Sequence, residues 1–125
     1  MASILIIGED PAEIDFDGPD APPEGVTAET IMDGLNGSVA RLGADGHAAE
    51  LLLTKDEDTV EAQAREALAD RSFDVIVIGA GLRTLPPMAG QFERLINVLR
   101  IEAPWAKLAF NSSPADSDEA ARRWL

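Results

Sequence analysis

SILIIGED, residues 3–10, is the stretch of sequence that decides the fold. Its Ile and Leu residues form an unbroken aliphatic run, which Gly8, Glu9 and Asp10 bring to an end. Strands inside a parallel sheet are buried on both faces and have this composition, whereas strands with one solvated face alternate apolar and polar residues. The run therefore predicts a buried strand over residues 3–7 with acidic residues at its carboxyl end.

Three further strands and four helices are predicted along the rest of the chain. The strands are expected at residues 48–54, at residues 73–78, which end in Gly79-Ala80-Gly81, and at residues 107–110. The first helix is expected to begin at Thr27 and end before Gly43, and the second to run from Asp58 to about Asp70. The third is expected from Pro86 to before Pro104, and the fourth from Asp116 to Trp124-Leu125. The first predicted helix has Ile31, Leu35, Val39 and Leu42 on one face.

The alternation of strands and helices predicts an α/β protein. Parallel neighbouring strands need long crossover connections, and right-handed crossovers place helices on both faces of the sheet. We expect one three-layer α/β/α domain over residues 1–125, with a four-stranded parallel sheet in the order 2-1-3-4 of a flavodoxin-like fold. Residues 11–26 hold four prolines and show no period, which predicts a long loop that is either functional or disordered.

Charge and composition exclude several classes of partner. The chain of 125 residues has a formal net charge of −13 and no cysteine. A polyanion would approach against this field, so neither nucleic acid nor an anionic membrane is expected to bind. The absence of cysteine fits a reducing compartment, and the apolar runs are far shorter than the roughly 20 residues of a membrane span. A cytoplasmic protein without a signal peptide is the expectation.

Four segments of the chain carry a resemblance to a known family. They are ILIIGED from Ile4, LGADGHAAELLLT from Leu42, FDVIVIG from Phe73 and APWAKLAFNS from Ala103. Together they resemble the receiver domains of response regulators over most of the chain outside residues 11–26. The strand and helix endings that carry the resemblance are shared by many flavodoxin-like proteins, so it bears on the fold.

The resemblance also implies what this chain lacks. Receivers accept a phosphoryl group on an aspartate that closes the third strand, and Gly79 stands at that position, so we expect no stable phosphorylation by small phosphodonors. Glu9 and Asp10 match the acidic pair that binds magnesium in the family, and Ser112 matches its hydroxyl after the fourth strand. The fifth strand and its lysine have no counterpart. The resemblance therefore implies a degenerate receiver, and we assign it no metal site and no cofactor.

The candidate site lies at the carboxyl ends of the predicted strands. Ligands of open α/β sheets bind there, at the point where the strand order reverses. The expected ligand-binding residues follow the third and fourth strands: Gly79, Ala80, Gly81, Arg83, Asn111, Ser112 and Ser113. Arg83 is expected to bind a carboxylate or phosphate, and its alternative role is an ion pair with Glu9 or Asp10. The same two carboxylates, Glu9 and Asp10, are the candidates for a general base.

Other motifs are interpreted as structural. The glycines after the third strand resemble a dinucleotide fingerprint, but Thr84 replaces the third glycine and no acidic residue follows at the ribose-binding position. Seven carboxylates between Glu9 and Glu24 are interpreted as a solvated acidic loop, since they lack the spacing of a calcium loop. His47, the one histidine, is expected at the amino-terminal edge of the sheet, away from the site.

Two functions follow from these observations. The first is the binding of a small anionic or carbonyl-bearing ligand at the carboxyl edge, with residues 11–26 as a lid; whether a reaction accompanies binding stays open. The alternative is a receiver-like regulatory module that is not phosphorylated and acts through contact with a partner protein. A homodimer through the edge of the fourth strand and the apolar end Trp124-Leu125 is a further expectation.

Overall fold

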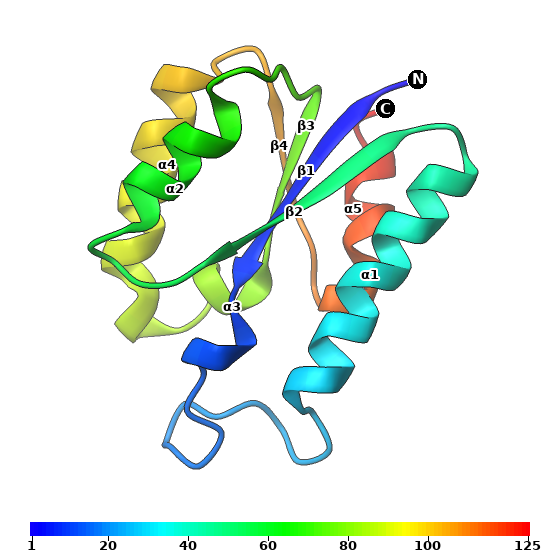
Figure 1. Cartoon of the computed structure of the whole chain (residues 1–125). Helices are drawn as coiled ribbons and strands as arrows, with labels where there is room; N and C mark the ends of the chain where they lie inside the picture. The colour runs from blue at the N-terminus through cyan, green and yellow to red at the C-terminus, as the bar shows by residue number, and fades with distance from the viewer.

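A four-stranded parallel sheet forms the centre of the molecule. The computed structural model describes residues 1–125 (Figure 1). The strands are β1 (Ser3–Glu9), β2 (Ala48–Thr54), β3 (Val75–Ile78) and β4 (Lys107–Phe110), and they lie in the order β2-β1-β3-β4. Every neighbouring pair is parallel. The predicted strand order is therefore confirmed, and the topology is flavodoxin-like.

Helices cover both faces of the sheet (Figure 1). The two longest are α1 (Ala28–Ala44) and α4 (Ala89–Glu102). On one face, α1 and α5 (Ser117–Arg122) pack against Ile4, Ile6, Val75 and Val77. On the other, α2 (Val60–Leu68) and α4 pack against Leu5, Ile7, Ile76 and Ile78. Successive residues of a strand point to opposite faces, so the continuous aliphatic composition of β1 and β3 supplies both halves of the core.

The register brings the carboxyl ends of β1, β3 and β4 to the same edge of the sheet. Ile7 pairs with Ile78, and Ile78 pairs with Phe110. Gly8, Gly79 and Asn111 therefore follow these positions at neighbouring points of the carboxyl edge, which is the lower end of the sheet in Figure 1, and Glu9 ends β1 one residue further on. The short helix α3 (Ala80–Arg83) and the three 3₁₀ turns Pro11–Glu13, Pro86–Met88 and Pro114–Asp116 complete this end of the molecule.

Several element boundaries differ from those expected from the sequence. Thr27 caps α1 as predicted, since its hydroxyl accepts a hydrogen bond from the Thr30 amide. Asp58 does not cap α2; the Asp56 carboxylate accepts from the Thr59 amide and hydroxyl one turn before the helix. β3 begins at Val75, although Phe73 is still buried in the core. The glycine turn after β3 forms α3, a helix that was not expected from the sequence.

No helix of the structure combines the length and the apolar composition needed to cross a membrane.

Candidate functional site

A cleft of about 660 Å³ opens at the carboxyl edge of the sheet. Its floor is the end of β1 and the turns that follow β3 and β4, and its outer wall is the acidic segment between residues 13 and 26. All but one of the predicted ligand-binding residues line this cleft: Gly79, Ala80, Gly81, Asn111, Ser112 and Ser113. The structure therefore brings these residues together, with Glu9 beside them.

Glu9 is the carboxylate of β1 that faces the cleft. Its side chain is partly buried, and this burial raises the pKa of the carboxyl group. The negative charge of Glu13, another residue of the cleft wall, adds to the increase in pKa. A carboxylate that is held away from water beside a second negative charge favours the approach of a cation or a proton.

We expect Glu9→Gln to stabilise the fold near neutral pH. An acid with a raised folded-state pKa favours folding at low pH, and this contribution is lost as the pH rises through that pKa. The ionised carboxylate therefore costs free energy at about pH 7, and removing it should raise the free energy of unfolding by about 0.5 kcal/mol, because solvent screens a partly exposed charge. Urea unfolding measures the change. Near pH 3 the two proteins should be equally stable, and an equal gain at both pH values would contradict the assignment.

Asp10 does not line the cleft. Its carboxylate forms an ion pair with Lys55, which follows β2, and accepts a hydrogen bond of 2.9 Å from the Ala12 amide. The hydrogen bonds from Lys55 and Ala12 lower the pKa of Asp10. A carboxylate held in its ionised form by a lysine is a weak base. Of the two candidate bases, only Glu9 is therefore placed in the cleft.

Gly79 allows β3 to approach β1 closely at the floor of the cleft. Its amide donates to the Ile7 carbonyl at 2.8 Å. A Cβ atom at this position would lie 3.2 Å from the Ile7 carbonyl oxygen and 3.5 Å from the Gly8 Cα. A larger residue there would require the backbone of β1 to shift by a few tenths of an ångström, so glycine suits the close approach of the two strands.

Asn111 joins the two turns that form the floor. Its Oδ1 accepts a hydrogen bond of 2.8 Å from the Ala80 amide, and its Nδ2 donates to the Ser117 hydroxyl at 2.9 Å. The side chain is buried, and both ends of its amide are occupied. Asn111 was expected to donate to a ligand, but in the structure it positions the backbone of the cleft instead.

Ser112 and Ser113 bind a carboxylate that belongs to the chain itself. The Ser112 amide donates to Asp116 Oδ1 at 2.9 Å and the Ser113 amide at 3.1 Å, and the Ser112 hydroxyl donates to Asp116 Oδ2. Burial alone would raise the pKa of Asp116, but these hydrogen bonds lower it on balance. The position at which an external anion would meet these donors is therefore taken by Asp116.

Arg83 lies outside the cleft, contrary to the role expected for it. Its guanidinium donates to the Ile78 and Asn111 carbonyls and stacks on the Phe110 ring, 4.6 Å from the centroid. Burial lowers its pKa. It forms no ion pair with Glu9 or Asp10, so the alternative role is not observed either. The reason is α3, because one helical turn points Ala80 and Thr84 to the cleft and directs Arg83 towards β4.

The charged residues that line the cleft are all acidic. They are Glu9, Glu13, Asp15 and Asp20. No Lys or Arg lines it, and no three His, Cys, Asp or Glu residues are grouped so that they could hold a metal ion. The rest of the wall is largely apolar and includes Ile31, Leu85 and Met88, which were not expected at the site from the sequence.

His47 lies at the amino-terminal edge of the sheet, as expected, where its Nδ1 accepts a hydrogen bond from the Ala2 amide at 3.0 Å.

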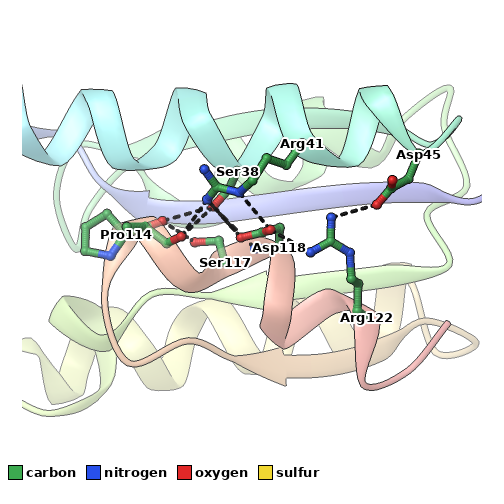
Figure 2. A network of polar contacts seen from close by, with 8 residues as sticks. Ser38, Arg41, Asp45, Pro114, Ser117, Asp118 and Arg122 are labelled. Atoms are coloured by element: carbon green, nitrogen blue, oxygen red, sulfur yellow. Dashed lines mark hydrogen bonds and ion pairs between the residues drawn. The ribbon is translucent and has the colours of Figure 1, made fainter.

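A polar network centred on the buried Asp118 carboxylate holds the turn after β4 against α1 (Figure 2). The Asp118 carboxylate accepts from Ser38, Arg41 and Arg122. Arg41 Nη2 also donates to the Ala115 carbonyl at 2.7 Å, and the Ser117 hydroxyl donates to the Pro114 carbonyl at 2.9 Å. Pro114 lines the cleft, so this network fixes one of its walls.

The fold and the cleft together define a flavodoxin-like α/β protein with a cleft at the carboxyl edge of its sheet. The charged residues of this cleft are acidic, and most of its remaining surface is apolar. No family model matches the chain, and no curated protein sequence matches it.

Proposed function

We propose that the protein binds a small organic molecule in the cleft at the carboxyl edge, and that this molecule has an apolar body and a neutral or cationic polar group. The observation that carries the proposal is a cleft of about 660 Å³ whose charged lining is exclusively acidic. Ligand sites have volumes of roughly 300–1,000 Å³, with mostly apolar walls and few polar groups. The cleft also lies where open α/β sheets bind their ligands.

Each part of such a ligand would have a matching group in the lining. Ile31, Leu85 and Met88 provide an apolar surface for its body. Glu9 provides the acceptor for an ammonium or a hydrogen-bond donor, and a cation there would relieve the repulsion between Glu9 and Glu13. Pairing a cation with a partly buried carboxylate contributes more binding free energy than pairing it with an exposed one, because solvent screens the buried charge less. We therefore expect bound ligand to lower the pKa of Glu9.

An anionic ligand is less compatible with this lining. Arg83, the residue on which that expectation depended, has its guanidinium on backbone carbonyls and on Phe110. The amides of Ser112 and Ser113 already bind Asp116. An anion would meet four carboxylates without a countercharge, which disfavours it by repulsion.

The test uses two probes of similar shape and opposite charge, 2-phenylethylamine and 3-phenylpropanoate, in an NMR titration of the labelled protein. We expect the amine to shift amide signals of residues 79–85 and 111–113 and the acid to shift none. Gly81→Leu should weaken binding of the amine by about tenfold, because Gly81 lines the cleft and a Cβ there meets no neighbour within 4 Å. The new side chain can occupy the cleft without disturbing the fold.

Gly43→Leu is the matched control. Gly43 is also exposed, and a Cβ there would also meet no neighbour within 4 Å, but it lies in α1 away from the cleft. Both variants should keep or slightly gain stability, since replacing a helical glycine reduces the entropy of the unfolded chain. Equal binding of the amine by both variants, or tighter binding of the acid, would refute the proposed site.

A further inference from the structure

β4 is the edge strand of the sheet on the side opposite β2, and its outer backbone groups have no strand beside them. The Lys107 amide donates to the Asp74 carbonyl at 3.0 Å, towards β3. Successive residues of a strand direct their N–H and C=O groups to opposite sides, so those of Leu108 and Phe110 point away from the sheet. The Phe110 carbonyl is taken by Arg123 Nη2 at 2.8 Å. The N–H and C=O groups of Leu108 and the N–H group of Phe110 therefore remain available to another strand.

Two faces of this edge differ in character: Leu108 and Phe110 form a largely apolar face, with Arg83 stacked on the Phe110 ring, and Lys107 and Arg123 form a cationic face. Leu108 and Phe110 pair with Ile76 and Ile78 and thus lie on the α2 and α4 side, where they are 36% and 46% exposed. Lys107 pairs with Val75 and thus lies on the α1 and α5 side, the side from which Arg123 reaches the strand. Trp105, just before the strand, is 57% exposed.

The charge of the edge contrasts with that of the whole chain, whose formal net charge is −13. Six of the ten Lys and Arg residues form ion pairs with carboxylates. The four that do not are Arg83, Arg100, Lys107 and Arg123. Three of these four contact or belong to β4: Lys107, Arg83 on the Phe110 ring and Arg123 on the Phe110 carbonyl. Two carboxylates near this edge accept hydrogen bonds from other groups: Asp116 accepts from the Ser112 and Ser113 amides, and Asp74 accepts from the Ser3 amide.

We propose that β4 binds an extended acidic segment of a partner protein, which adds a strand to the sheet. Backbone hydrogen bonds to Leu108 and Phe110 would supply affinity, and alternate side chains would supply specificity, as in other strand additions. A segment that alternates apolar and acidic residues fits both faces of this edge. Its apolar side chains would cover Leu108 and Phe110, and its carboxylates would pair with Lys107 and Arg123.

A second copy of the chain fits this edge less well than an acidic segment does. In an antiparallel pair of β4 strands, Lys107 of one copy lies beside the end of the other strand, where Arg83 and Arg123 are placed. Like charges opposite one another destabilise a strand pair. The homodimer expected from the sequence is therefore an alternative outcome of the test.

The experiment titrates the protein with an N-acetylated octapeptide that alternates Glu and Val, and with the same peptide carrying Lys in place of Glu. We expect the acidic peptide to shift amide signals of residues 105–110 and the basic peptide to bind at least tenfold more weakly. Lys107→Glu combined with Arg123→Glu should reverse this preference, because it replaces the cations of one face with carboxylates. Affinity for the acidic peptide should fall as salt is raised.

Leu108→Pro tests the backbone contact separately. Proline removes the outward N–H of Leu108 and leaves the hydrogen bonds to β3 in place, and proline is tolerated at such positions of edge strands. We expect binding of the acidic peptide to fall about tenfold with circular dichroism unchanged. Absence of binding by the wild-type protein, equal binding of both peptides or shifts elsewhere in the molecule would overturn the proposal. A concentration-dependent dimer in sedimentation that Lys107→Glu with Arg123→Glu abolishes would assign the edge to a second copy instead.

Discussion

Asp118→Asn should cost about 3 kcal/mol of unfolding free energy and lower the melting temperature by roughly 10 °C. Asp118 is 2% exposed, and it joins α5 to α1. Its carboxylate accepts from Arg41 Nε at 2.9 Å, Arg41 Nη2 at 3.0 Å, Arg122 Nη1 at 2.7 Å and Ser38 Oγ at 3.2 Å (Figure 2). Asparagine keeps the shape but removes the charge and turns one acceptor into a donor that faces arginine N–H groups. Two half-exposed arginines can return to water, which keeps the loss at the lower end for a buried pair.

Asp45→Asn is the control within the same network. Asp45 pairs with Arg122 at 2.7 Å, but both side chains are well exposed, so its replacement should cost at most about 0.5 kcal/mol. Urea unfolding of both variants measures the difference. Similar losses for the two would show that burial does not strengthen the Asp118 network.

The Asp118 network should also make stability depend on pH. Hydrogen bonds from Arg41 lower the pKa of Asp118 well below its usual range. The stabilisation is therefore complete above the unfolded-state pKa of about 3.9 and is lost as the pH falls from there towards the folded-state pKa. The wild-type protein should lose stability below about pH 4, and Asp118→Asn should lose less over the same range.

Gly34→Leu should destabilise the protein by about 3 kcal/mol. Gly34 lies in the middle of α1, where the helix packs against the turn after β4. A Cβ atom there would lie 3.0 Å from the Ala115 amide nitrogen and 3.0 Å from Pro114 Cβ. The contact is partly with backbone, which cannot rotate away, so a leucine side chain has to push α1 and the turn apart.

Gly43→Leu again provides the control, because it makes the same substitution in the same helix at a position without neighbours. It should leave stability unchanged or raise it by up to about 1 kcal/mol, as expected when a helical glycine is replaced. Denaturant unfolding of the pair separates packing from helix propensity. If Gly34→Leu were as stable as Gly43→Leu, the close approach of α1 to Pro114 would be wrong.

Asp118→Asn and Gly34→Leu should also affect the cleft. Pro114 lines it, and the Ser38 and Ser117 hydroxyls both donate to the Pro114 carbonyl. Loosening this contact displaces the wall formed by residues 111–114. The 2-phenylethylamine probe should therefore bind more weakly to Asp118→Asn than to Asp45→Asn, even at temperatures where both are folded.

The sequence determined the fold, because fold class depends on patterns that are local in the chain. The aliphatic runs of β1 and β3, the helical stripes between them and the strict alternation of the two predict a parallel sheet with helices on both faces. The same pattern places Glu9, Gly79 and Asn111 at one edge, as the register of the strands confirms.

Only the tertiary structure decided what the side chains at that edge do. Whether a polar group is available to a ligand depends on which other groups fold against it, and those groups lie far away in sequence. Asn111 is taken by Ala80 and Ser117, Asp10 by Lys55, and Arg83 by two carbonyls and Phe110. Glu9 alone among the expected charged residues faces the cleft, because β1 ends beneath the acidic wall. Its surroundings, and not its position in the chain, therefore set its chemistry.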